Sequence, residues 1–235
     1  SRPSLDRLFR PRSVAVVGAS AHEESISGRP LKLLRDYRFP GAVYPVNPRH
    51  AALGGLPCYP DLRSLPEGPD VVLVGVRAEL VPGVLEQCGA VGAGCAVVFS
   101  SGFAEGGDPM AQERLSRIAR ETGVRVLGPN CQGLVNLAEG IPLSFSASLD
   151  TARRPLGPVA YISQSGAFGF ASFAMAADQG VGFRYVATTG NQADLDVVDL
   201  GRYVLEDPEV RLLLLYLEGL AEGDRFLELL EEARR

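Results

Sequence analysis

Short apolar runs bounded by Gly and Pro alternate with longer amphipathic segments along this chain of 235 residues. In the first half, the apolar runs predict five strands, at residues 14–17, 42–46, 71–76, 95–99 and 125–127. Helices are predicted between them at residues 28–36, 81–91 and 109–122. Such alternation is typical of parallel βαβ units, so we predict a doubly wound, Rossmann-like α/β domain over residues 1–128.

The second half of the chain, residues 129–235, predicts another α/β domain. After Gln132 the alternation breaks, and residues 139–158, with their prolines and serines, predict a loop. The pattern then resumes with a strand at 159–162, a helix at 166–179, a strand at 183–187, a helix at 196–205, a strand at 212–217 and a helix at 224–234. An α/β domain normally supplies a further strand after such a helix, so we expect this domain to be incomplete, as in a fragment or one subunit of an assembly.

Composition excludes several classes of protein. The net charge of −5 and the absence of a Lys/Arg block argue against nucleic-acid binding, because phosphate backbones are bound by basic patches. No apolar run approaches the roughly 20 residues that a membrane span requires, and no signal-peptide pattern begins the sequence. These features predict a cytoplasmic protein that binds neither nucleic acid nor membrane.

The cysteines, histidines and lysine narrow the chemistry further. Four cysteines without a CxxC pair, in a chain of this size, predict reduced thiols. His22 and His50 are too few for a metal site, so we expect no metal. Lys32, the sole lysine, does not follow the glycine-rich frame of a P-loop, so ATP hydrolysis at a P-loop is not expected.

The turns after the first two predicted strands are candidates for binding phosphate groups. Gly18, Ala19 and Ser20 form a strand-to-helix turn, where unpaired backbone N–H groups bind anions; the alternative is a purely structural turn, since GxGxxG is not matched. The second strand is followed by Asn47 and Arg49 where an NAD site places a carboxylate. This pair suits the phosphorylated ribose of CoA or NADP, unless Arg49 is simply a solvated arginine.

Two further loops at the same edge of the predicted sheet complete this candidate site. Val76 and Arg77 end the third strand, and Ser100 and Gly102 end the fourth, at the carboxyl edge where open α/β sheets bind ligands. The polar, thiol-bearing loop GPNCQG, with Asn130 and Cys131, follows the fifth strand. Together with the first turn, this loop predicts coenzyme A.

Cys131 has two interpretations. A thiol near a helix start can have a depressed pKa and act as a nucleophile. A nucleophile needs a base, however, and neither His22 nor His50 is placed beside Cys131 by the sequence. We therefore favour a residue that lines the ligand site.

The second domain offers a possible phosphoryl site. Ser165 and Gly166 follow a strand and open a helix, which again gives anion-binding geometry; the GxSxG motif of hydrolases is not in frame. Glu218 ends a strand at a sheet edge, with the alternative that it stabilises a helix N-terminus as an acidic residue.

Eight ordered segments between Leu8 and Arg234 resemble the NDP-forming (ADP-forming) acyl-CoA synthetases, relatives of the succinyl-CoA synthetase α subunit. These segments are VAVVGAS, VYPVNPR, VRAELVP, SSGFAEGG, GPNCQG, ISQSGAFG, TTGNQADLDVVDL and YLEGL. The resemblance implies that the second domain is flavodoxin-like. It also implies that CoA lies against the residues Gly18, Ala19, Ser20, Asn47, Arg49, Val76 and Cys131.

The resemblance further implies an acid–thiol ligase that makes acyl-CoA through a phosphorylated histidine. Ser165 and Gly166 would face the phosphoryl group, and Glu218 would steady the histidine. In the family that histidine lies beyond the position of Arg235, and ATP, ADP and Mg²⁺ bind to an ATP-grasp subunit or domain. We therefore expect this chain to bind CoA without turning over alone, and the complete enzyme to be oligomeric.

Two other functions stay open from the sequence. A related region in some protein acetyltransferases lacks the histidine and serves as a non-catalytic module that senses acyl-CoA. An NADP-binding oxidoreductase would account for the first turn and Arg49, but it leaves the second domain unexplained.

Overall fold

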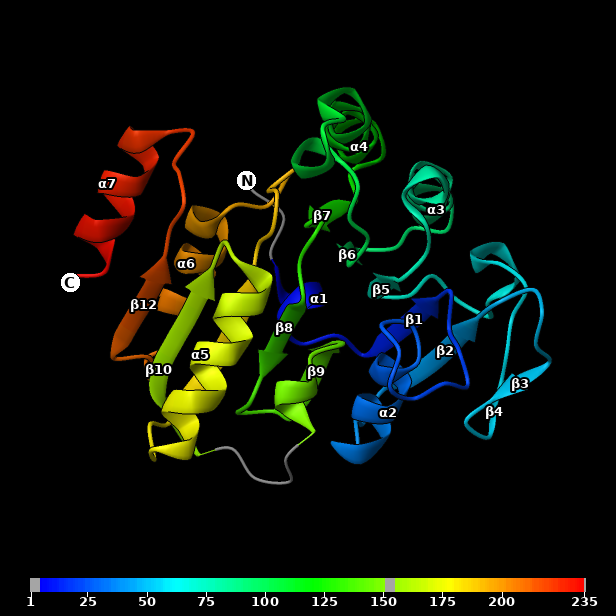
Figure 1. The fold of residues 1–235 in the computed structure, drawn as a ribbon, viewed down its shortest axis with the longest axis horizontal. Helices are drawn as coiled ribbons and strands as arrows, with labels where there is room; N and C mark the ends of the chain where they lie inside the picture. Colours follow the sequence, from blue (N-terminus) through cyan, green and yellow to red (C-terminus); the bar gives the residue numbers. More distant parts are fainter. Residues whose placement is uncertain (1–4, 151–154, 235) are drawn as a thin grey trace.

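The computed structural model describes residues 5–150 and 155–234. Two α/β units lie side by side, each built around a five-stranded sheet (Figure 1). A small hairpin of β3 (Ala52–Leu53) and β4 (Leu56–Pro57) projects from the first unit. None of the helices in the described ranges is long and apolar enough to cross a membrane.

The first sheet is entirely parallel, with the strand order β2-β1-β5-β6-β7. Its strands are β1 (Ser13–Val17), β2 (Ala42–Val46), β5 (Val71–Val74), β6 (Cys95–Val98) and β7 (Arg125–Leu127). Valine predominates in the central strands, and its branched side chain favours the extended backbone. All residues of β1, β5 and β6 are buried, because helices cover both faces of the sheet.

The helices of the first unit follow the order expected for βαβ crossovers. They are α2 (Arg29–Asp36), α3 (Val81–Ala90) and α4 (Pro109–Thr122). Helices α3 and α4 lie on one face of the sheet and α2 on the other (Figure 1). The prediction of a doubly wound, Rossmann-like unit is therefore confirmed, and the predicted bounds of β2, β7 and α4 are the observed ones.

The second sheet is mixed, with the strand order β12-β10-β11-β8-β9. Its strands are β8 (Gly133–Asn136), β9 (Ile141–Ser144), β10 (Leu156–Ser163), β11 (Phe183–Thr188) and β12 (Leu212–Tyr216). Strands β10, β11 and β12 are parallel, whereas β8 runs antiparallel to both β11 and β9. Helix α5 (Gly166–Asp178) covers one face, α6 (Val197–Leu205) covers the other, and α7 (Gly223–Glu232) packs against α6.

The expectation of a loop over residues 139–158 is wrong for the part that the structure describes, because β9 and the first residues of β10 fall within it. Residues 151–154 lie outside the described residues. Strand β9 was not predicted because Pro142 lies within it, and a proline interrupts the usual strand pattern. In the structure Pro142 lies on β9, which among the described strands pairs only with β8 and forms the edge of the sheet. An edge strand tolerates the missing N–H group, because one side of its backbone has no partner strand.

The two units share one hydrophobic core. Phe9, at the end of α1 (Asp6–Phe9), is fully buried and stacks on Tyr203 of α6, with the ring centroids 4.4 Å apart. Its backbone carbonyl accepts a hydrogen bond of 3.1 Å from the side-chain amide of Asn136 in β8. The predicted boundary after residue 128 falls between β7 and β8, but it stays a prediction, because α1 of the first unit packs into the second.

A backbone junction also joins the carboxyl ends of the two sheets. The loop after β11 runs along β7 and the segment that follows it, and three N–H groups of the loop donate to this stretch: Asn191 to Pro129, Ala193 to Gly128 and Leu195 to Val126, at 2.9, 2.9 and 3.0 Å. Beside this ladder, the Arg125 guanidinium pairs with Asp194 at 2.9 Å. The loop is therefore held to the first unit by both backbone and side-chain contacts.

Gly190 permits this close approach. Its φ of +56° lies in the left-handed region, and a Cβ atom at this position would overlap the carbonyl oxygens of Pro129 and Asn130. Only glycine lacks the atom that would push the two loops apart.

We expect Gly190→Ala to lower the free energy of unfolding by about 2–4 kcal/mol, because it adds both backbone strain and steric overlap. The matched control is Gly223→Ala, since Gly223 has ordinary backbone geometry and open space where a Cβ would lie. That control should change stability by less than about 0.5 kcal/mol. Guanidinium denaturation of both variants measures the difference, and equal effects would contradict the proposed constraint.

Candidate functional site

The turn after β1 is held tightly against the neighbouring strands. Gly18 has a φ of +84°, and a Cβ atom there would lie 2.6 Å from the carbonyl oxygen of Gly75. The Gly18 N–H group donates to the carbonyl of Val46 at 2.9 Å. No residue other than glycine fits this position, so the turn passes directly over the carboxyl ends of β2 and β5.

Asn47 connects this turn to the loop after β2. Its side-chain amide donates to the carbonyl of Ala19 at 2.8 Å, and its side-chain oxygen accepts the N–H group of Arg49 at 3.0 Å. The sequence predicted a ligand contact for Asn47, and the structure adds a positioning role. Asn47 therefore fixes the position of the Arg49 backbone relative to the first turn.

A cavity of about 450 Å³ opens beside the turn. Four of the predicted residues line it together, namely Gly18, Asn47, Arg49 and Val76. Its other walls include Leu62, Leu80 and Val84, so an apolar ring could pack there. Arg49 is exposed and, within residues 5–150 and 155–234, makes no ion pair, which leaves its guanidinium available for a phosphate group.

Other predicted ligand residues do not line this cavity. Ser20 accepts the N–H group of His22 at 3.1 Å and lines a different cavity. Arg77 is largely exposed and pairs with Glu79 at 3.1 Å. Ser100 donates to the carbonyl of Val76 at 2.5 Å. A ligand role for these residues, and for Gly102 in the loop after β6, stays a prediction.

A second cavity, of about 460 Å³, lies where the carboxyl ends of the two sheets meet. It brings together residues that the sequence assigned to separate sites, namely Asn130, Cys131, Ser165, Gly166 and Glu218. Loops from both units form its walls. Sequence order alone does not show this meeting of the two units.

Cys131 is a lining residue in this cavity and is poorly placed to act as a nucleophile. Its side chain is buried, with Sγ 3.4 Å from the carbonyl oxygen of Val98. Burial raises the pKa of the Cys131 thiol to about 12, so the thiolate is scarce at neutral pH.

The N-terminus of α5 faces the second cavity. Ser165 caps the helix by accepting the N–H group of Phe168 at 3.4 Å, and Gly166 is the first helical residue. Ser165, Gly166 and Ala167 all line the cavity, so the unpaired N–H groups of the first turn lie at its wall. This is a suitable environment for a phosphoryl group.

Gln164 is a positioning residue that sequence reasoning missed. It is buried, and its side-chain oxygen accepts the N–H groups of Glu218 and Gly219 at 2.5 and 3.0 Å. Its amide donates back to the Gly219 carbonyl at 2.6 Å. These three bonds hold Glu218, which is itself exposed, across the cavity from α5. The only signal in the sequence was a glutamine at the end of an apolar strand.

Glu105 and Asn191 form a second link that the sequence did not reveal. The Glu105 carboxylate accepts the N–H group of Gly102 at 2.6 Å and a hydrogen bond from the Asn191 side-chain amide. Asn191 in turn accepts from the side chain of Asn130 at 3.2 Å. Burial opposes ionisation of Glu105, but these hydrogen bonds outweigh it and lower the pKa of the carboxyl group.

Histidine and metal chemistry are not evident at either cavity. His22 and His50 are exposed, and neither lines the second cavity. Within the described ranges, no group of three or more His, Cys, Asp or Glu residues is arranged to hold a metal ion.

Family models match both parts of the chain. The model described as a CoA binding domain matches residues 12–136, and the model described as a succinyl-CoA ligase like flavodoxin domain matches residues 156–235. The chain therefore carries both domains in the order that the resemblance implied.

Several relatives of this chain are named as ADP-forming ligases. Acetate–CoA ligase [ADP-forming] I of Archaeoglobus fulgidus is 37% identical over 98% of this chain and 33% of its own length. Subunit alpha of acetate–CoA ligase [ADP-forming] I of Pyrococcus furiosus is 36% identical over 99% of this chain and 51% of its own length. The chain thus spans about a third to a half of the relatives it matches.

A solved structure agrees with these relatives. The apo form of dinucleotide forming acetyl-coenzyme A synthetase 1 from Ca. Korarchaeum cryptofilum superposes with a TM-score of 0.91 and 39% identity, over 96% of this chain and 49% of that one. The chain belongs to the family of NDP-forming acyl-CoA synthetases, relatives of the succinyl-CoA synthetase α subunit, and corresponds to their part with the CoA-binding and flavodoxin-like domains.

Proposed function

We propose that this chain is the CoA-binding portion of an NDP-forming acyl-CoA synthetase, which interconverts acid, CoA and ATP with acyl-CoA, ADP and phosphate. The observation that carries the proposal is the pair of cavities at the carboxyl ends of the two sheets. One is suited to a phosphorylated nucleotide, and the other to a phosphoryl group. CoA has a nucleotide at one end and a thiol at the other, so one cavity would hold its nucleotide and the other would bring its thiol to the phosphoryl group of an acyl phosphate.

In the nucleotide cavity, Gly18 would let the pyrophosphate of CoA approach the turn closely, and Ala19 would present its backbone N–H group, because the Gly18 N–H group already donates to Val46. Arg49 would contact the 3′-phosphate of the ribose, since its guanidinium is exposed at the rim of that cavity. The apolar wall at Leu80 and Val84 would cover the adenine ring. Each part of the nucleotide thereby has a chemically matched partner.

In the second cavity, the CoA thiolate would attack the carbonyl carbon of an acyl phosphate. The new C–S bond forms as the C–O bond to phosphate breaks, and phosphate leaves with the bonding electrons. The first turn of α5, at Ser165 and Gly166, would stabilise the negative charge of the phosphoryl group. Glu218 would orient the histidine that carries the phosphoryl group. That histidine must come from outside the described residues.

The remaining components of the enzyme belong to the same proposal. ATP or ADP and Mg²⁺ would bind to an ATP-grasp domain or subunit, and the complete enzyme would be an oligomer in the cytoplasm. Support for a larger protein comes from the relatives, of which this chain spans a third to a half.

We expect this chain to bind CoA more tightly than dephospho-CoA in a calorimetric titration. Arg49→Ala should weaken CoA binding about 10-fold or more and leave dephospho-CoA binding unchanged, because only the 3′-phosphate contact is lost. Arg117→Ala, on the exposed face of α4, is the matched control and should bind both ligands normally. Equal loss for both ligands would refute the 3′-phosphate contact, and binding of NADP but not CoA would favour an oxidoreductase.

In the protein that includes the histidine, Glu218→Gln should lower kcat by about 100-fold with little change in KM for CoA. Arg49→Ala should instead raise KM for CoA and leave kcat nearly unchanged. Steady-state kinetics of both variants provide the comparison. If Glu218→Gln changed only KM, the proposed role beside the phosphohistidine would be wrong.

We expect one of the four thiols to react rapidly with Ellman's reagent at pH 8, because Cys58 is partly exposed and the other three are buried. Burial raises the pKa values of Cys88, Cys95 and Cys131 to about 12, which further slows their reaction. Cys58→Ser should remove the rapid phase. Rapid loss of a thiol in that variant, traced to Cys131 by mass spectrometry, would restore the nucleophile interpretation.

A further inference from the structure

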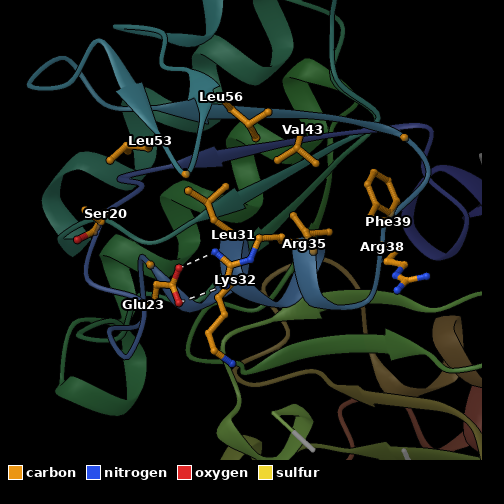
Figure 2. Close-up of a pocket in the computed structure, with 15 residues that line it drawn as sticks. Ser20, Glu23, Leu31, Lys32, Arg35, Arg38, Phe39, Val43, Leu53 and Leu56 are labelled. Carbon is orange, nitrogen blue, oxygen red and sulfur yellow. Dashed lines mark hydrogen bonds and ion pairs between the residues drawn. The ribbon is translucent and has the colours of Figure 1, made fainter. Parts of the chain in front are cut away.

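A third cavity, of about 380 Å³, lies beside α2 and has no role in the proposed reaction. Figure 2 shows it between α2, strand β2 and the β3–β4 hairpin. Most of its wall is hydrocarbon, contributed by Leu31, Leu34, Phe39, Val43, Leu53 and Leu56. Its volume and apolar lining are those of a small-molecule site.

Three cations and one carboxylate supply the charge of this cavity. The cations are Lys32, Arg35 and Arg38, and the carboxylate is Glu23. Lys32 is already paired with Asp150 at 2.7 Å and with Asp36 at 3.2 Å, and Asp36 also contacts Arg35 at 3.1 Å, so the charges here are balanced. A guanidinium group beside an apolar wall nevertheless favours a ligand that has an anionic head and a hydrocarbon body.

Arg35 is the cation best placed to bind that head. Its two terminal nitrogens donate to the two oxygens of Glu23 at 2.6 and 3.3 Å, in the paired geometry that guanidinium forms with a carboxylate (Figure 2). Both side chains are about half exposed, at 53% and 46%. An exposed ion pair of this kind contributes little stability, so a competing carboxylate can displace Glu23 at small cost.

Glu23 lies on the loop of residues 20–28, which leads from the phosphate-binding turn to α2. The loop has its own hydrogen bonds, from the Ser25 hydroxyl to the His22 carbonyl at 2.7 Å and from the Gly28 N–H group to Ser25 at 3.0 Å. The loop can therefore keep its local shape when Glu23 leaves Arg35. The backbone amides of this loop, including that of Glu23, should therefore report the replacement of Glu23 on Arg35 by a ligand.

We propose that this cavity binds an amphipathic monocarboxylate, whose carboxylate replaces Glu23 on Arg35 and whose hydrocarbon body packs against Leu31, Val43 and Leu53. In the unliganded protein, the Glu23 carboxylate occupies the position on the Arg35 guanidinium that the carboxylate of the ligand would take. The hydrocarbon wall selects for a ligand longer than acetate, because acetate has almost no apolar surface to bury. This site is separate from both cavities assigned to CoA.

The test is a titration of the ¹⁵N-labelled chain with hexanoate, followed by NMR. Hexanoate should shift the backbone amides of Glu23, Ser25 and Gly28 and saturate at a concentration on the order of 1 mM, as expected for a ligand of this size. Acetate supplies only the charge and 1-hexanol only the hydrocarbon, so neither should saturate these shifts over the same range. If 1-hexanol saturated these amide shifts at the same concentration as hexanoate, the proposed role of the carboxylate would be wrong.

Variants of the ion pair separate this proposal from nonspecific binding. Glu23→Gln should tighten hexanoate binding several-fold, because it removes the internal competitor. Arg35→Gln should weaken it at least 10-fold. Glu24→Gln is the matched control, since Glu24 lies on the same loop but pairs with Arg29, and it should leave the affinity unchanged.

Arg35→Lys provides a second test of the anion contact, because it keeps the charge and loses the two-nitrogen geometry. Its affinity should fall between those of the wild type and Arg35→Gln. Unchanged affinity in both Arg35 variants, or no gain in Glu23→Gln, would overturn the proposal. These outcomes do not depend on CoA binding, so they are distinguishable from a failure of the proposed synthetase function.

Discussion

The architecture of the site depends on the close backbone contact that the loop after β11 makes with β7 and the segment that follows it. Gly190 allows the two segments to touch, and three backbone hydrogen bonds then align them. Because this contact joins the carboxyl ends of two separate sheets, it determines the position of the α5 N-terminus relative to Asn130 and Cys131. Without it, the second cavity would have only one of its two walls. The shared core around Phe9 holds the other side of the same interface.

Polar side chains then refine what the backbone has brought together; Gln164 is buried, Asn47 is half-buried and Glu105 is exposed. Asn47 fixes the first turn, Gln164 holds the Glu218 loop, and Glu105 connects with Asn191 across the junction. None of these residues needs to react with a substrate in order to matter. The hydrogen bonds of Gln164 replace the solvation that this buried amide loses, and the bonds of all three side chains select one arrangement of the loops. The groups left available, Arg49 and the first turn of α5, are the ones proposed to bind phosphates.

Much of the fold was predictable because its signals are local. Helix α4 begins after the N-cap Asp108 and ends at Gly123, whose φ is +76°, and the predicted bounds are the observed ones. The hairpin of β8 and β9 was not predictable in this way. Its strands are short, and Pro142 lies within one of them. Pairing with β11 stabilises the hairpin, and the local pattern carries no information on that pairing.

The same distinction between local and long-range signals applies to the candidate site. Gly18 directly follows β1 and Arg49 lies in the loop after β2, so topology alone predicted that they would meet, and both line one cavity. Cys131 was grouped with them, but it lines the other cavity with Ser165 and Glu218. Glu105 and Asn191 are 86 positions apart, and Gln164 is 54 positions from Glu218. Contacts over such separations arise from tertiary packing, which the pattern of a single sequence does not show.

The central claim is that one CoA molecule extends from the nucleotide cavity to the cavity at the α5 N-terminus. A crystal structure of this chain with CoA bound tests it most directly. The account predicts the 3′-phosphate roughly 3 Å from the Arg49 guanidinium, as in a charge-assisted hydrogen bond, and the thiol beside Asn130 and Gly166. A CoA molecule whose nucleotide lay elsewhere, or whose thiol pointed away from the junction of the two sheets, would contradict it.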